Sequence, residues 1–406
     1  MIHYGRAPFL DQFPRSRVPS YPRHSGPLSS EVVVIGGGLT GCAAAYAFAA
    51  AGIQVTLVEA DRLGGGATQA VPGWISEDPG VGFVDVEKLI GIKAARHAFQ
   101  AWRRAALDFS ALLRRLDIQC HLEARSALTV AFTPEQIARL KKEHKARVGA
   151  GLETPALNAR AVSAEVALNA AFALRGRDGA TIDPYRACLG LAKAAAERGA
   201  RIYERSPMKR ITFNRKTADV HTSGGAIHAQ RVVVATAMPS GVFQSLARHF
   251  WFRTAYMALT EPVPAKIRRE LGKRITVVRD SADPPHLVRW LDDERLLVAG
   301  ADTETPPERL NGKATVQQRT MQLMYELSVL YPEISGLQPA YGWSVNYSRT
   351  AEGLPYIGPH RNFPHQLFAF GDSSQSVTGA YLASRILLRH HLGETEPPDL
   401  AFEFTR

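Results

Sequence analysis

Apolar and polar residues are arranged along the first sixty residues in blocks that predict a strand, a helix and a second strand. Residues 32–35 form a continuous apolar run, which is typical of a strand buried on both faces. Residues 39–51 are small and apolar and favour a helix, and residues 54–59 return to a strand pattern. This order predicts a β-α-β unit. Five prolines interrupt residues 1–30, so we expect an extended arm before the unit.

Similar α/β patterns return in the second half of the chain, separated by stretches of a different kind. The elements that they predict are a helix at 185–198 ending at Gly199, a strand at 200–204, a hairpin at Gly224 and Gly225, a buried strand at 232–235, a strand at 367–370 and a helix at 379–392. We therefore expect Rossmann-like pieces at three places in the sequence, with other material inserted twice.

The inserted stretches combine two helices with a run of strands. Residues 99–116 carry apolar side chains three and four positions apart, which predicts a helix packed on the core. Residues 126–132 predict a strand, and Thr133 with Gln136 predicts a capped helix start. The strands predicted without intervening helices are 256–259, 275–279, 286–291 and 295–299. Such a run favours an antiparallel sheet in a second domain.

Length, charge and cysteine usage narrow the class of protein only moderately. A chain of 406 residues exceeds what one core usually organises, so two domains are expected. The net charge of +11 suits phosphate-bearing ligands, anionic membranes or nucleic acid equally well. Three scattered cysteines indicate neither a disulfide framework nor a metal site.

The uncharged stretch at 32–58 is long enough to resemble a membrane span, but its glycines divide it into elements too short to cross a bilayer. Residues 1–30 lack the apolar core of a signal peptide. We therefore expect a soluble, cytoplasmic protein with no transmembrane segment and no metal site.

Three glycines stand between the first predicted strand and the helix that follows it. Gly36, Gly38 and Gly41 form the pattern GxGxxG, in which the glycines permit a tight turn, close approach to a pyrophosphate, and packing of helix on strand. The start of the helix then offers free backbone N–H groups to phosphate. Glu59 ends the second strand, where a carboxylate can bind ribose hydroxyls and disfavours the phosphate of NADP. The pattern predicts a dinucleotide site.

Two further features favour FAD over NAD. Residues 64–68 form a second loop of small residues directly after Glu59. Far downstream, Gly371 and Asp372 end a predicted strand and precede a helix, whose N-terminus would stabilise negative charge developing on a flavin. A glycine and an aspartate before a helix can also be only a turn and a helix N-cap, with no role in cofactor binding.

Several ordered segments resemble the FAD-dependent D-amino acid oxidase superfamily, and most of all the branch of glycine oxidase, sarcosine oxidase and gamma-glutamylputrescine oxidase. The matching segments are VVVIGGGLTGCAAAYAFAAAGIQVTLVEADRLGGGAT, ATIDPYRACLGLAKAAAERGARIYE, VVVATA, LTEPVP, RLLVAGAD, TAEGLPYIG and LFAFGD, spread over residues 31–393. The resemblance implies that a carbon–nitrogen bond of a small amine or amino acid is oxidised by hydride transfer to flavin N5, with oxygen or a quinone as electron acceptor.

The resemblance also implies the fold and the cofactor site. We expect an α/β protein with a glutathione-reductase-like Rossmann-type FAD-binding domain assembled from residues 31–80, 181–245 and 340–395, and an α+β substrate domain with an antiparallel sheet formed by residues 81–180 and 246–339. The residues expected around the FAD are Gly36, Gly38, Leu39, Thr40, Gly41, Glu59, Ala60, Gly66, Ala67, Thr68, Met208, Ala235, Thr236, Gly371, Asp372, Ser374, Gln375 and Ser376.

The chain departs from the family pattern near the substrate. Glycine-oxidase-like members carry a carboxylate-binding arginine three residues before the threonine that matches Thr350, and Tyr347 stands there instead. This departure favours an amine without an α-carboxylate as the substrate, unless Arg289, Arg253 or Arg349 binds the substrate carboxylate instead. Ser374 and Ser376 replace the glycines of a Gly-His-Gly loop. No cysteine lies in the last third of the chain, so we expect noncovalent FAD.

Three residues are the candidates for catalysis. His286 could shuttle a proton near neutral pH, although a lone histidine is more often structural. Arg289 lies on the opposite face of the same predicted strand and could hold a carboxylate. Tyr347, together with Trp343, could wall the substrate site or simply pack in the core.

Two other functions stay open at this point. One is a tRNA-modifying oxidase of the same superfamily, but the basic residues are scattered, so nucleic acid is not the expected partner. The other is an assembly protein that binds flavin but catalyses no reaction. The serines at 374 and 376, in place of the family's glycines, are consistent with this function.

Overall fold

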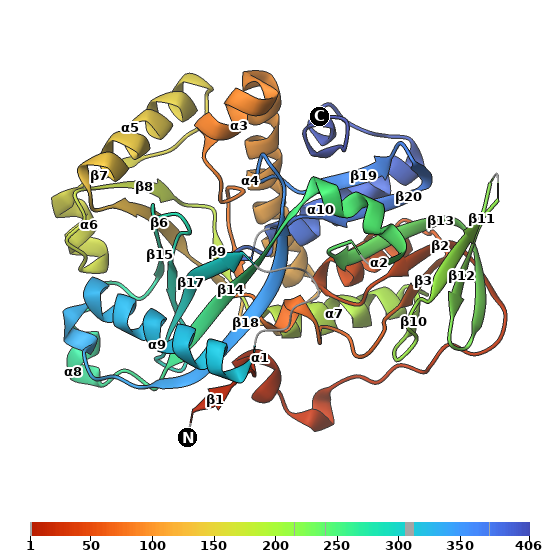
Figure 1. Cartoon of the computed structure of the whole chain (residues 1–406), viewed down its shortest axis with the longest axis horizontal. Coiled ribbons are helices and arrows are strands. Elements are labelled where there is room, and N and C mark those ends of the chain that lie inside the picture. The colour runs from red at the N-terminus through yellow and green to blue at the C-terminus, as the bar shows by residue number, and fades with distance from the viewer. Residues whose placement is uncertain (1, 215, 240, 305–311, 373) are drawn as a thin grey trace.

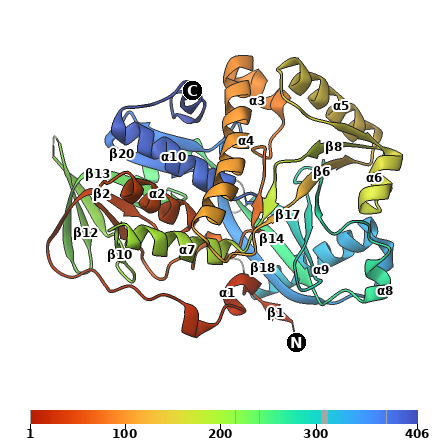
Figure 2. The same ribbon diagram turned by 180° about the vertical axis from the view of Figure 1, so that it is seen from behind.

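Two large β-sheets lie side by side and both draw strands from distant parts of the chain (Figures 1 and 2). The computed structural model describes residues 2–214, 216–239, 241–304, 312–372 and 374–406. No helix in these ranges is long and apolar enough to cross a membrane.

The smaller sheet is built around parallel strands that include the predicted β-α-β unit. Its path is β10 (Arg201–Tyr203), β3 (Val55–Val58), β2 (Leu28–Ile35), β13 (Gly225–Ala237), β12 (Ala218–Thr222) and β11 (Arg210–Phe213), with β20 (Phe363–Phe370) and β19 (Tyr356–His360) joined beside β13. Val32 pairs with Val55, and Val232 pairs with both Val33 and Gln366. The apolar runs of β2 and β13 are fully buried, as expected for strands covered on both faces.

Three helices cover one face of this sheet: α2 (Leu39–Ala50), α7 (Pro184–Glu197) and α10 (Thr378–Leu392). α2 packs between α7 and α10, and its buried alanines and Phe48 allow close approach. On the other face Val33 and Val234 pack with Phe243, Phe368 and Phe370. The parallel, doubly covered sheet confirms the predicted Rossmann-type architecture.

The larger sheet is mainly antiparallel. Its order is β1 (His3–Tyr4), β18 (Pro339–Arg349), β14 (Trp251–Thr260), β17 (Leu296–Glu304), β16 (Leu287–Trp290), β15 (Thr276–Asp280), β6 (Ser126–Ala131), β8 (Phe172–Gly176) and β7 (Ala156–Asn158). The strands predicted at 256–299 pair antiparallel, as expected. β1 and β18, and β15 and β6, are instead parallel pairs.

The remaining elements connect and cover the sheets. A small sheet joins β4 (Trp74–Ile75), β9 (Ala180–Thr181) and β5 (Glu123–Ala124). The other helices are α1 (Pro8–Asp11), α3 (Phe83–Ile90), α4 (Ile92–Arg115), α5 (Pro134–Gly149), α6 (Ala159–Val166), α8 (Ala265–Arg268), α9 (Lys313–Leu330) and the short 3-10 turns η1 (Arg15–Arg17), η2 (Ala67–Gln69), η3 (Gly241–His249), η4 (Pro332–Ile334) and η5 (Asp399–Phe402).

Two local features differ from the sequence prediction. The N-terminal arm is not wholly extended, because Pro8 begins a short helix and residues 28–30 already belong to β2. Helix α9 was not predicted, since apolar residues lie on both its sides: Leu323 and Leu327 are buried, whereas Tyr325 is exposed.

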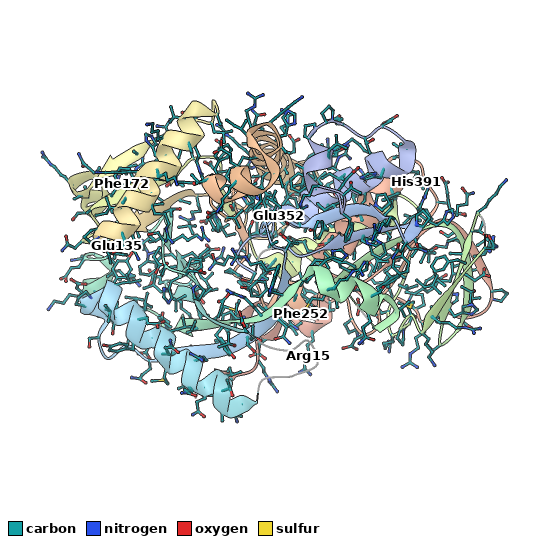
Figure 3. The ribbon with its side chains drawn as sticks, turned by 45° about the horizontal axis from the view of Figure 1, so that its top comes forward. Arg15, Glu135, Phe172, Phe252, Glu352 and His391 are labelled. Atoms are coloured by element: carbon teal, nitrogen blue, oxygen red, sulfur yellow. The ribbon has the colours of Figure 1, made fainter. Side chains whose placement is uncertain are left out.

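The division into an FAD-binding and a substrate domain stays a prediction. Segments 31–80 and 181–245 supply most of the smaller sheet, whereas β18, within segment 340–395, pairs with β14 in the larger sheet. Phe172 and His391 lie at opposite ends of the molecule in Figure 3, with Glu352, which follows β18, between them. The loops after β18 therefore lie between the two halves.

Candidate active site

A cavity of about 410 Å³ lies at the carboxyl ends of β2, β3 and β13, and we call it the glycine-loop cavity. Most residues expected around the cofactor line it: Gly36, Gly38, Leu39, Thr40, Glu59, Ala60, Gly66, Ala67, Thr68, Met208, Ala235, Thr236, Asp372, Ser374 and Ser376. In open α/β sheets, ligands bind beyond the carboxyl ends of the strands. The position of the cavity thus suits a nucleotide.

The start of α2 provides a place for phosphate. Gly38 is the N-cap and offers no side chain to the first turn. Thr68 Oγ1 accepts a hydrogen bond from the N–H of Leu39 at 2.8 Å. The positive end of the helix dipole therefore faces the cavity at a residue without a Cβ. A Cβ at Gly38 would lie 3.1 Å from Thr68 Oγ1 and narrow the cradle.

The other two glycines of the motif shape the turn. Gly36 has φ +106°, and a Cβ there would lie 2.5 Å from the carbonyl oxygen of Ala235. A Cβ at Gly41 would lie 1.8 Å from the carbonyl oxygen of Gly36. Gly41 accordingly lies outside the cavity wall and allows α2 to pack on the preceding strand.

Backbone donors orient the carboxylate of Glu59. Its Oε2 accepts from the N–H of Gly37 at 2.6 Å, and its Oε1 accepts from the N–H of Asp61 at 2.8 Å. Each carboxylate oxygen retains further acceptor capacity, which ribose hydroxyls could use.

The far end of the glycine-loop cavity lies between β20 and α10. Gly371 has φ +84°, and a Cβ on Gly379 would meet the carboxylate of Asp372, so this carboxylate lies over the start of α10. Gly371 and Gln375 face a different cavity, described next. The cavity thus offers the N-terminus of α2, a carboxylate suited to ribose hydroxyls at Glu59, and the N-terminus of α10. These residues fit FAD, which Thr68, Glu59 and Asp372 would help to hold.

A second cavity of about 360 Å³, the polar cavity, adjoins the first. Tyr347, Ser348, Asp372 and Ser374 line both cavities, so the two meet at these residues. Strands β6, β15, β17 and β18 supply much of its wall. A molecule in the polar cavity would therefore reach the end of the glycine-loop cavity that adjoins α10.

A tyrosine and an aspartate are paired where the cavities meet. The hydroxyl of Tyr347 donates to Oδ2 of Asp302 at 2.6 Å, reaching from β18 to β17 across β14. Burial raises the pKa of Asp302, and the hydrogen bond from Tyr347 opposes part of that rise. Burial and the adjacent carboxylate raise the pKa of Tyr347, so its phenol stays a donor. Only Tyr347 of the three predicted catalytic residues lines the polar cavity.

His286 lies outside both cavity walls. Its Nδ1 is 2.7 Å from Asp280 Oδ2 and its Nε2 is 3.0 Å from Glu326 Oε2 on α9. Burial lowers the pKa of His286, but the bonds to Asp280 and the two carboxylate charges outweigh that effect and raise it to about 9. The ring is held as an ion-paired link between the sheet and α9.

Arg289 also lies outside both cavity walls. Its Nη1 donates to the carbonyl of Gly73 at 3.0 Å and its Nη2 to the carbonyl of Ile182 at 3.2 Å. Burial lowers its pKa to about 10. Trp343, the other aromatic candidate, is buried and donates to the carbonyl of Ala70 at 2.8 Å. Both side chains hold the loop after η2 against the larger sheet.

Asp302 and Arg279 are among the charged residues of the polar cavity that sequence reasoning missed. Arg279 donates from Nη2 to the carbonyl of Gly80 at 2.6 Å and from Nε to Oε1 of Gln375 at 3.1 Å. Burial lowers its pKa. Arg279 ends the predicted strand 275–279, and Asp302 follows the predicted strand 295–299. A charged residue at the end of an apolar strand was therefore the sequence feature that could have identified them.

The geometry defines a nucleotide-binding α/β protein with an adjoining polar cavity. A family comparison matches residues 31–389 to the DAO family of FAD-dependent oxidoreductases. The chain belongs to this family. It is an FAD-dependent oxidoreductase, as the sequence resemblance predicted.

Individual relatives agree with this assignment. The chain is 28% identical to gamma-glutamylputrescine oxidoreductase of Escherichia coli over 91% of its own length and 85% of the relative's. It is 25% identical to glycine oxidase of Bacillus subtilis, over 88% and 93% of the two chains. Its fold is similar to glycine oxidase of Geobacillus kaustophilus, with a TM-score of 0.75, 21% identity and coverage of 93% and 99%. L-proline dehydrogenase of P. horikoshii has a TM-score of 0.77, 19% identity and coverage of 93% and 97%.

Proposed function

We propose that this protein oxidises a carbon–nitrogen bond of a small amine or amino acid, with the substrate in the polar cavity and FAD in the glycine-loop cavity. The observation that carries the proposal is that the two cavities meet at Tyr347 and Ser348. Relatives named for gamma-glutamylputrescine and glycine support both an amine and an amino acid as substrate. Bound FAD supplies the hydride acceptor.

The chain's own residues position the reactants. Thr68 and the start of α2 would hold the cofactor's phosphates, and Glu59 would hold a ribose. Tyr347 and Asp302 lie beside the junction of the two cavities, and the walls of the polar cavity would orient a substrate toward the cofactor.

We further propose noncovalent FAD, a cytoplasmic location, and oxygen or a quinone as electron acceptor. The three cysteines are all buried and free, and none lines either cavity, which supports a cofactor without a thioether link.

The test is an anaerobic screen of amines and amino acids against the purified yellow protein. We expect at least one compound to bleach the flavin absorbance, and denaturation to release FAD into solution. Release of FMN, or a flavin that no amine or amino acid reduces, would contradict the proposal.

A further inference from the structure

Asp302 places a carboxylate beside the junction of the two cavities. Its Oδ2 is occupied by the Tyr347 hydroxyl, but its Oδ1 makes no hydrogen bond with any residue that the structure describes. No lysine or arginine nitrogen in the described ranges lies within ion-pair distance of it. Asp302 lines the polar cavity, so a hydrogen-bond acceptor is available to a molecule bound there.

Three other carboxylates of this cavity are ion-paired. Asp280 is paired with His286, at 2.7 Å. Asp78 and Glu143 share Arg147, at 3.3 Å and 2.7 Å. Asp302 and Glu77, whose Oε2 accepts from the N–H groups of Arg177 and Asp178, each keep one carboxylate oxygen without a hydrogen bond among the described residues. Of these two, only Asp302 is bonded to a residue that lines both cavities, Tyr347.

Charged groups face Asp302 at longer range. They are Arg253, His286 and Arg349, whose positive charges favour the ionised carboxylate, and the Tyr347 hydroxyl, which donates to it. Arg253 has its own partner, Glu304, at 3.8 Å. Burial opposes these charges and raises the pKa of Asp302, which makes the carboxylate a better proton acceptor than an exposed one.

The proposed reaction creates a need for such a group. An alkylamine carries an extra proton at neutral pH, because its pKa is near that of lysine, about 10.4. The nitrogen lone pair must be free before hydride can leave the neighbouring carbon. An amine that binds as the ammonium ion must therefore lose one N–H proton within the site.

We infer that Asp302 binds the substrate's ammonium group and accepts one of its protons through Oδ1. The N–H bond breaks, its electron pair stays on nitrogen, and the carboxylate becomes a carboxylic acid. The oxidation that follows would remove hydride from the neighbouring carbon, with FAD as the acceptor when it is bound, and the product would be an iminium ion. Tyr347 positions the carboxylate through Oδ2. This inference rests on the proposed function.

Binding is tested first, with a compound that cannot react. tert-Butylammonium has N–H groups but no hydrogen on the carbon next to nitrogen, and tert-butanol is its neutral counterpart. In the holoenzyme we expect tert-butylammonium to bind, as measured by calorimetry or by a shift of the flavin spectrum. Asp302→Asn should weaken its binding by about ten- to a hundredfold, the size expected for a charge-assisted hydrogen bond, and leave tert-butanol unchanged.

Kinetics then test the proton transfer. With an amine that reduces the wild-type flavin, Asp302→Asn should slow flavin reduction at pH 7 at least tenfold, and the rate should recover as pH rises toward the pKa of the free amine. A merely structural role would not produce this pH-dependent recovery. Glu270→Gln, which changes an exposed carboxylate outside both cavities in the same way, is the control and should change neither measurement.

Unchanged tert-butylammonium binding and an unchanged pH profile in Asp302→Asn would overturn the inference. If that variant does not retain FAD, Asp302→Ser takes its place with the same two outcomes. A wild-type flavin that no amine reduces would contradict the proposed function instead, while the binding measurement would still decide whether Asp302 recognises ammonium.

Discussion

The backbone N–H of Leu39 donates to Thr68 Oγ1 at 2.8 Å, and a Cβ at Gly38 would lie 3.1 Å from that same oxygen. Gly38 has φ −77°, which alanine also adopts, so Gly38→Ala should fold. Its methyl group would crowd the phosphate cradle. We expect FAD affinity to fall about tenfold or more, equal to about 1.4 kcal/mol, measured by fluorescence titration of the apoprotein.

Gly41→Ala should behave differently from Gly38→Ala. A Cβ there would lie 1.8 Å from the Gly36 carbonyl oxygen, a contact that only a backbone shift can relieve. We expect loss of folded apoprotein, seen as a lower melting temperature or insolubility. Gly149→Ala has open space around its Cβ and serves as the control. A Gly41→Ala protein as stable as wild type would contradict the packing role.

Most residues that line the glycine-loop cavity could be predicted from sequence because local chain geometry brings them together. A glycine turn, a helix start and the end of a strand are neighbours in sequence, so Gly36 to Glu59 contained most of the information needed. Asp372 was found from a strand–helix junction for the same reason. The covering helix α9 was missed because its apolar residues do not form one stripe.

The polar cavity was harder to predict because side chains from separate strands meet there. The alternation of side chains along a strand predicted correctly that His286 and Arg289 point to opposite faces. It could not show how far along the strand a cavity extends. Arg279 pairs with Leu287 across β15 and β16, and it lies nearer to the polar cavity than Arg289 does. Asp302 on β17 lies near Tyr347 on β18 because β14 is the strand between them in the sheet, and no local sequence pattern encodes this strand order.

Arg289→Met should reduce stability more than catalysis. The guanidinium holds the carbonyls of Gly73 and Ile182, and methionine would leave both without their donor. We expect the free energy of unfolding to drop by roughly 1.5 to 3 kcal/mol, measured by urea denaturation of the holoenzyme. Flavin reduction rates should stay within about twofold. A selective loss of activity on carboxylate-bearing substrates, at unchanged stability, would show instead that Arg289 reaches the substrate.

His286 should make stability depend on pH on the alkaline side. Its pKa is raised from 6.5 to about 9 by Asp280 and Glu326 despite burial, so its contribution is fully present below pH 6.5 and is lost as pH rises through 9. Relative to His286→Gln, wild type should be more stable by about 2 kcal/mol at pH 6, after allowance for solvent screening of the partly exposed ring. Urea denaturation of both proteins from pH 6 to pH 9.5 measures this. A difference that grows with pH would contradict the ion-paired assignment.

The positive charges near the substrate determine whether a carboxylate is recognised. Tyr347 occupies the position where amino-acid-oxidising relatives are expected to carry arginine, and its hydroxyl is engaged by Asp302. Both Nη atoms of Arg289 are engaged by backbone carbonyls outside the polar cavity. The guanidinium groups that do line this cavity are those of Arg139, Arg147, Arg175, Arg279 and Arg349.

Because Tyr347 and Arg289 are both engaged by other residues, we predict that an amine is oxidised in preference to the matching α-amino acid. A phenol cannot replace the two-point contact of arginine with a carboxylate, and loss of a charged hydrogen bond of roughly 1.5 to 3 kcal/mol corresponds to about a ten- to hundredfold lower rate. Flavin reduction rates for amino acids and their decarboxylated amines measure the preference. If the amino acids are faster by tenfold and Arg279→Met or Arg349→Met removes that advantage, the carboxylate site has moved to this wall and the prediction is wrong.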